Sequence, residues 1–113
     1  MKRYSLETTP YEQISHNPKL KKRVLFHKGV VPGLMHLSQV VLPKGSDAVE
    51  HTHDINSEVF YCLRGRIIFV VNGEEQPLGP GECMVVEPGE PHSIKDVPEE
   101  AEMVYFMNEP EAA

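Results

Sequence analysis

The sequence predicts an all-β domain, because turn-forming residues recur at short intervals and short runs of Val, Ile, Leu and Phe lie between them. Eight Gly and ten Pro are too few for a low-complexity chain and too many for a helical bundle. No window shows the 3.6-residue periodicity of an amphipathic helix over more than one turn. Short strands joined by such turns are typical of a β-sandwich or β-barrel.

Turn signals set the limits of the expected strands. Pro32-Gly33 precedes the first strand and Pro43-Lys44-Gly45 ends it, whereas Gly65 separates the second strand from the third. Asn72-Gly73 is a strong hairpin signal after the third strand. The strands are expected at Leu34–Leu42, Val59–Leu63, Arg66–Val71, Glu82–Val86 and Met103–Met107.

The length of 113 residues allows one domain, for which we expect a β-barrel over residues 29–108. Residues 1–28 carry a net charge of +5 and are expected to form a basic arm, in which Pro10–His16 could form one helical turn. Residues 29–113 carry a net charge of −11 and end in an acidic tail over residues 109–113. The acidic body argues against nucleic acid as a partner, and the cluster Lys19–Arg23 has no interleaved aromatic residues. We expect the arm to be solvated or to lie against the acidic body of its own or a neighbouring subunit.

The sequence also indicates a cellular location. No apolar run approaches the roughly 18 residues of a membrane span, and the N-terminus lacks an apolar signal core. We therefore expect a soluble cytoplasmic protein without a membrane partner. Cys62 and Cys83 are then expected to be reduced, buried thiols rather than a disulfide.

A candidate metal site lies between Gly45 and His92. Side chains two residues apart on an extended chain share a face, roughly 6.6 Å apart along the strand, so His51 and His53 can present two imidazoles to one point. Glu58 follows a short polar stretch and opens an apolar strand, while the corner formed by residues 88–91 delivers His92. Three imidazoles and one carboxylate suit Mn, Fe, Co, Ni, Cu or Zn rather than Ca or Mg. If the ion is six-coordinate, two positions stay open for water, substrate or O₂.

The spacing of these residues resembles the two motifs of the cupin family. The first motif, G-x5-H-x-H-x(3,4)-E-x6-G, is matched at every specified position by Gly45, His51, His53, Glu58 and Gly65. The second motif, G-x5-P-x-G-x2-H-x3-N, is met by Gly81, Gly89 and His92, but Glu87 stands in the Pro slot and Asp96 in the Asn slot. Neither departure removes a ligand. They put the local loop geometry in doubt rather than the metal site.

The resemblance implies a double-stranded β-helix, or jelly roll, with a divalent transition metal inside one end. It also implies the ligand set His51, His53, Glu58 and His92. Small single-domain cupins commonly form homodimers in which N-terminal strands pack on the partner's sheet or exchange with it. That arrangement would bring the basic arm against an acidic body.

Strand alternation suggests which other side chains line the pocket. Phe60 and Cys62 share the face of Glu58, where Cys62 is more simply a core filler than a thiol near the metal. His16 and His27 lie in the basic segment and are expected at the surface. Two further choices stay open: the inward set of the first strand is His36, Ser38 and Val40 or Leu37, Gln39 and Val41, and that of the last strand is Tyr105 and Met107 or Val104 and Phe106.

The resemblance favours a small metalloenzyme that acts on a small oxygenated substrate. Its candidate reactions are dioxygenation, decarboxylation and isomerisation. A decarboxylase would need a second inward acid that the chain does not obviously offer, and an isomerase base is missing if Glu58 is bound to the metal. Dioxygenase-like chemistry is therefore slightly favoured. The alternative is a non-catalytic cupin that binds or senses a metal or a small molecule.

Overall fold

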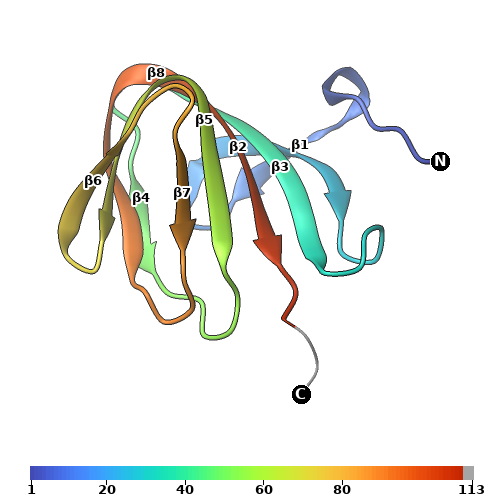
Figure 1. Ribbon diagram of the computed structural model, residues 1–113. Helices are drawn as coiled ribbons and strands as arrows, with labels where there is room; N and C mark the ends of the chain where they lie inside the picture. The colour runs from blue at the N-terminus through green and yellow to red at the C-terminus, as the bar shows by residue number, and fades with distance from the viewer. Residues whose placement is uncertain (111–113) are drawn as a thin grey trace.

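The computed structural model describes residues 1–110, and most of these residues lie in β-strands (Figure 1). A single turn of 3₁₀ helix, η1 (Leu6–Thr8), precedes the strands. Among the residues described, no helix has the length and apolar character needed to cross a membrane. The all-β prediction is confirmed. The strands are β1 (Tyr11–Ile14), β2 (Asn17–His27), β3 (Leu34–Leu42), β4 (Ala48–His51), β5 (Glu58–Val71), β6 (Glu74–Leu78), β7 (Cys83–Val86) and β8 (His92–Asn108).

Two long strands, β5 and β8, take part in both layers of the fold (Figure 1). The first part of β8 pairs with β4 and with the last part of β5. The last part of β5 also pairs with β6. The last part of β8 pairs with β3 and with the beginning of β5, which also pairs with β7. Strands β2 and β1 continue the second layer beyond β3. All pairs are antiparallel, and the arrangement is a jelly roll.

Gly65 lies where β5 passes from one layer to the other. Its φ of +78° belongs to the left-handed region that favours glycine. A Cβ there would lie 2.0 Å from the carbonyl oxygen of Glu100, and the register between β5 and β8 shifts on both sides of Arg64. The two strands expected at Val59–Leu63 and Arg66–Val71 are therefore one bent strand, in which Gly65 makes the bend rather than a break.

The expected hairpin at Asn72-Gly73 is confirmed. Val71 pairs with Glu74, so a two-residue loop joins β5 to β6. The φ angles of Asn72 (52°) and Gly73 (79°) are both positive, as a type I′ turn requires.

Most of the segment expected as an arm belongs to the sheet. Residues 11–27 form β1 and β2, and β2 pairs with β3, so the helical turn considered for Pro10–His16 is wrong. Leu20 and Val24 are buried on β2 while Lys19 and Lys21 are exposed. Lysines on the outer face obscured this alternation in the sequence, and such lysines are common near sheet edges.

The C-terminal end of β8 is also fixed. The backbone N–H of Glu109 donates to the carbonyl of Gly33 at 2.8 Å, and its carboxylate lies 2.9 Å from Lys28 Nζ. Of the expected acidic tail, residues 111–113 lie outside the described part of the chain.

The apolar core occupies the end of the jelly roll where β5 and β8 bend. Leu42, Ile67, Val97 and Ala101 are at most 1% exposed there. Cys62 is fully buried among them and fills core space. The expectation of two buried thiols is wrong for Cys83, which is exposed because it lies on the outer face of β7; both cysteines are free.

Candidate metal centre

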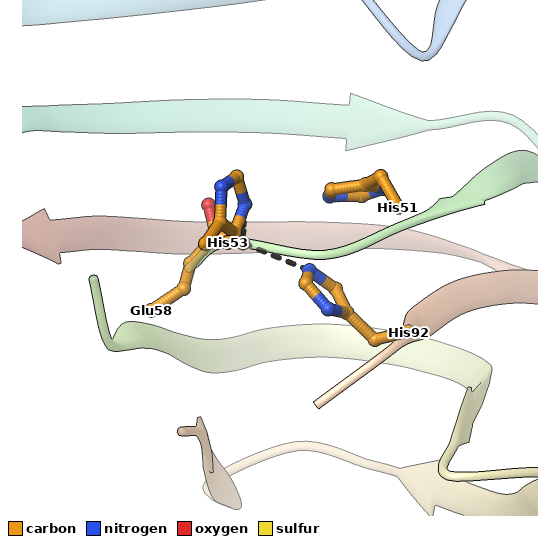
Figure 2. A group of neighbouring side chains, drawn as sticks. All are labelled: His51, His53, Glu58 and His92. Carbon is orange, nitrogen blue, oxygen red and sulfur yellow. Dashed lines mark hydrogen bonds and ion pairs between the residues drawn. The ribbon is translucent and has the colours of Figure 1, made fainter. Parts of the chain in front are cut away.

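The four residues proposed as ligands lie close together (Figure 2). They lie where β5 and β8 begin, away from the bend of these strands, and this end of the jelly roll is called the open end below. His51 ends β4, His53 follows it in the next loop, Glu58 begins β5 and His92 begins β8. The pairing of β4 with β8 sets His51 directly opposite His92. One potential ligand atom from each of the four residues lies within 4.8 Å of the others.

Glu58 is the anionic centre of this cluster. Its Oε1 lies 3.3 Å from Nε2 of His92, the contact dashed in Figure 2, and 3.5 Å from Nε2 of His53. The side chains of Glu58 and His92 are 8% and 2% exposed. The rings of His51 and His92 lie with centroids 4.1 Å apart. The carboxylate of Glu58 and the three imidazoles thus surround one small volume.

Backbone carbonyls orient two of the imidazoles. Nδ1 of His51 lies 3.1 Å from the carbonyl of Val49, and Nδ1 of His92 lies 2.9 Å from the carbonyl of Glu90. A carbonyl accepts only, so Nδ1 carries the proton in each ring and donates it. The neutral form of each ring then presents an unprotonated Nε2 to the centre, which is how a metal-binding histidine is commonly held.

Burial and neighbouring charges set the protonation of the cluster. Burial lowers the pKa of His51 to about 4, although its hydrogen bond to Val49 opposes this, so His51 is neutral near pH 7. Burial alone would lower the pKa of His92, but hydrogen bonds to Glu58 and to the Glu90 carbonyl outweigh it and raise that pKa. Burial would raise the pKa of Glu58, but the hydrogen bond from His92 and the nearby imidazoles lower it. Glu58 is therefore ionised and able to act as a ligand.

The geometry leaves one donor atom without a partner. Nε2 of His53 is buried and forms no hydrogen bond to any described residue, since 3.5 Å to Glu58 exceeds a normal hydrogen bond. An unsatisfied buried polar atom costs about 1–3 kcal/mol. An ion coordinated by the four residues would satisfy it. The nitrogen and oxygen donors fit a divalent transition metal rather than the oxygen-only environment that Ca²⁺ and Mg²⁺ prefer.

A cavity of about 280 Å³ adjoins the four residues and resolves the two choices that the sequence left open. His36 and Val40 line it from β3, and Tyr105 and Met107 line it from β8. Phe60 also lines the cavity, as expected from its alternation with Glu58.

Two of the candidate pocket residues lie elsewhere. Gln39 faces the other side of β3, where its Oε1 accepts from Arg23 Nε at 3.1 Å and its Nε2 donates to Glu102 at 3.0 Å. Cys62 lies in the core beyond the cavity, and its thiol donates to the carbonyl of Arg64 at 3.2 Å. Neither side chain belongs to the cavity lining.

Two further histidines line the cavity: His16, which was expected at the surface, and His36, which belongs to one of the two inward sets left open for the first strand. His16 stacks on His51 with ring centroids 3.5 Å apart and an interplanar angle of 10°. It sits in the turn between β1 and β2, and its carbonyl accepts from the Val49 N–H at 3.4 Å. His36 contacts the hydroxyl of Ser38 at 2.8 Å and meets the ring of Tyr105 edge-on. Inward alternation of β3 could have indicated His36, whereas no local pattern indicates His16.

The fold is a jelly roll, and three imidazoles and one carboxylate lie together at its open end. These two features define the class: a β-fold protein with a candidate metal site. The family model described as the Cupin domain matches residues 38–107, which is more than half of the chain. The chain belongs to the cupin family.

Individual relatives show how far the likeness extends. The chain is 38% identical over 53 residues to quercetin 2,3-dioxygenase of Bacillus subtilis, a match covering 47% of this chain and 16% of the enzyme. It is 34% identical over 59 residues to an oxalate-binding protein of Thermotoga maritima, a match covering 52% of this chain and 49% of that protein. Across the curated relatives that it matches, including these two, the chain covers at most 61% of the relative's own length.

Among solved structures, a predicted oxalate decarboxylase from Thermotoga maritima is similar to this fold. The TM-score is 0.84 at 23% identity, with 95% of this chain and 98% of that chain covered. This likeness supports the jelly-roll fold over nearly the whole chain.

Proposed function

We propose that the protein binds one divalent transition metal through His51, His53, Glu58 and His92. The carrying observation is the convergence of the four side chains around the unpartnered Nε2 of His53. With an ionised Glu58 the ligand set has one negative charge, so a divalent ion leaves the centre with a net charge of about +1.

On this site we propose a small metalloenzyme that acts on a small oxygenated substrate, with dioxygenase-like chemistry favoured. When bound, a redox-active metal would supply Lewis acidity and electron transfer. The chain supplies the enclosure: Phe60, Met103 and Met107 form apolar walls that exclude water, and the side chain of Tyr105 lines the cavity beside them. The likeness to quercetin 2,3-dioxygenase supports this choice.

The alternative is a non-catalytic cupin that binds a metal or a small molecule, and the likeness to an oxalate-binding protein favours it. Metal analysis followed by turnover assays separates the two. We expect about one transition-metal ion per chain, and O₂ uptake with a member of a diketone, catechol or thiol panel if the protein is an oxygenase. Stoichiometric ligand binding without turnover would favour the alternative. Absence of metal from protein purified and reconstituted with each of the six candidate ions would contradict the metal site and the metalloenzyme that depends on it.

We also propose a homodimer formed through the outer face of the layer that contains β5 and β7. Tyr61, Leu63 and Val85 are 42%, 46% and 55% exposed on this face, and Val85 pairs with Val59. Neighbouring exposed apolar side chains are typical of an interface. The opposite charges of residues 1–28 and 29–113 favour a second copy of the chain as the partner.

The dimer is tested by light scattering after size-exclusion chromatography. We expect the Val85→Lys variant to be monomeric and the wild type to be dimeric. Val49→Lys, at a position 65% exposed on β4, is the matched control and should stay dimeric. A monomeric wild type would overturn this proposal without affecting the metal site.

We further propose a cytoplasmic location, which the free thiols of Cys62 and Cys83 support. Cell fractionation tests it, and recovery from a membrane or secreted fraction would contradict it.

A further inference from the structure

The lining of the cavity includes one lysine, Lys22. Lys22 lines the cavity together with His16 and His36, and its positive charge is one of the causes that lower the pKa of each of these histidines. Its position on β2 agrees with this placement, because Lys22 pairs with Val40 and Val40 pairs with Met103, both of which line the cavity. The lysine therefore faces inward while Lys21 faces solvent.

Lys22 has no counter-charge of its own within the described residues. Three basic side chains form ion pairs: Lys28 with Glu109, Lys95 with Glu75, and Arg64 with Glu100 and Glu102. Residues 1–110 contain no ion pair to Lys22. Glu12 is its neighbour across β1 and β2, but the Glu12 carboxylate lies 3.1 Å from Nε2 of His27. Lys22 is partly buried as a residue, and an ammonium group without an ion-pair partner that lines a cavity is favourable for binding an anion.

The rest of the wall limits what that anion can be. Leu20, Val40, Leu42, Phe60 and Phe69 make much of the cavity apolar. A sugar carries a hydroxyl on nearly every carbon, and these five side chains offer none of its hydroxyls a hydrogen-bond partner. An apolar body with a charged end matches the lining better.

We propose that the cavity binds a small carboxylic acid with an apolar body, whose carboxylate pairs with Lys22 and whose other, oxygen-bearing end lies at the four-residue cluster of His51, His53, Glu58 and His92. This inference rests on the proposed metal site for the second contact only. Lys22 is then the residue that selects acids over neutral analogues of the same shape. A monoanion complements the positive charge that Lys22 and a metal-loaded cluster would both bring to the cavity.

The half-hydroxamates of succinate, glutarate and adipate are suitable probes, because the hydroxamate chelates a metal and the free carboxylate is available to Lys22. Each is compared with its terminal carboxamide by isothermal titration calorimetry on the cobalt(II)-loaded protein. We expect at least one acid to bind the wild type about 10- to 100-fold more tightly than its amide. The visible cobalt spectrum reports separately whether the hydroxamate reaches the metal.

Variants assign the preference to one side chain. Lys22→Met is expected to bind the acid as weakly as the amide, while Lys22→Arg keeps most of the difference. Lys21→Met, one residue away on the outer face, is the matched control and should behave as the wild type. An acid-to-amide ratio that Lys22→Met leaves unchanged, or that Lys21→Met reduces equally, would overturn the proposal.

The failure of the metal site would look different. A protein that takes up no cobalt contradicts the proposed function, and the role of Lys22 is then measured on the metal-free protein with 4-methylpentanoate and its amide. Loss of the acid preference in Lys22→Met still supports the inference there. An equal affinity of the wild type for acid and amide in both tests overturns it.

Discussion

The two ends of the jelly roll differ in what they bury. The bent end encloses apolar side chains such as Ile67, Val97 and Ala101, none of them measurably exposed. The open end buries Glu58 and His92, which are 6% and 2% exposed, and Nε2 of His53 there has no hydrogen-bond partner among residues 1–110. Apolar burial stabilises a fold, whereas incompletely paired polar burial costs stability unless a ligand completes it. The apolar packing that stabilises the fold therefore lies at one end, and the candidate site lies at the other.

The same two strands connect these ends. β5 and β8 begin at the proposed ligands Glu58 and His92 and run to the bend, so the packing at the bend fixes the register that brings these two residues together. Changes at the bend should act on the whole fold. Changes at the open end should act on binding with little effect on folding.

The largest effect is expected for Gly65→Ala. A Cβ at this position would lie 2.0 Å from the Glu100 carbonyl oxygen, and the φ of +78° disfavours alanine in any case. Strain and overpacking together should lower the free energy of unfolding by about 3–5 kcal/mol, measured by urea denaturation. Gly73→Ala is the control: its φ is +79° but nothing lies within 4 Å of the added Cβ, so about 1–2 kcal/mol is expected. Equal losses in the two variants would show that the bend is not closely packed.

The next effect is loss of metal from His92→Ala. This removes a proposed ligand whose ring is oriented by the Glu90 carbonyl and paired with Glu58. Metal affinity should fall by more than about 100-fold, measured by competition with a chelating dye. His27→Ala removes an exposed imidazole that contacts Glu12 and should bind metal as the wild type does. Unchanged affinity in His92→Ala would contradict the proposed ligand set.

The sequence could predict only part of this fold. Turn chemistry identified β3 at its observed bounds and the Asn72-Gly73 hairpin, because those signals are local. Local signals could not identify β1 and β2, whose lysines obscure a sparse buried face, nor join the two halves of β5. A glycine reads as a turn in the sequence, and only its contact with Glu100 shows that the strand continues through it.

The candidate site divides in the same way. Motif spacing brought out the four converging residues, since each lies at or near the end of a strand that the motif positions. The direction of alternation on β3 and β8 depends on register with neighbouring strands, so the sequence could not choose between Gln39 and His36. His16 reaches the site only because β1 and β2 pair and turn back, which is a tertiary event.

A smaller, graded effect is expected from pH. Hydrogen bonds to Glu58 and to the Glu90 carbonyl outweigh burial and raise the pKa of His92, so this imidazole takes up a proton at a higher pH than an ordinary histidine does. A proton on Nε2 competes with the metal, so affinity should be constant above the pKa of His92 and fall about tenfold per pH unit below it. His51, with a pKa of about 4, should add a second proton only in more acidic solution.

Dye competition across this pH range measures the effect, and nuclear magnetic resonance of the metal-free protein gives the pKa of His92. A Glu58→Gln variant removes the carboxylate that raises this pKa, so the pKa should fall in the metal-free variant. Metal affinity independent of pH through the measured pKa of His92 would contradict the assignment of its Nε2 as a ligand atom.

The smallest expected effect belongs to His16, the residue that joins the N-terminal strands to the open end. Its ring stacks on His51 at 3.5 Å, so it can act by holding that ring in place or as a further ligand. If it acts by stacking, His16→Ala should weaken metal binding about two- to tenfold, and His16→Phe should restore the affinity because a phenyl ring stacks without coordinating. If the imidazole were a ligand, phenylalanine would fail as alanine does. Because burial and the nearby Lys22 charge lower the pKa of His16, it is neutral near pH 7 in either case, and the two substitutions rather than pH distinguish the roles.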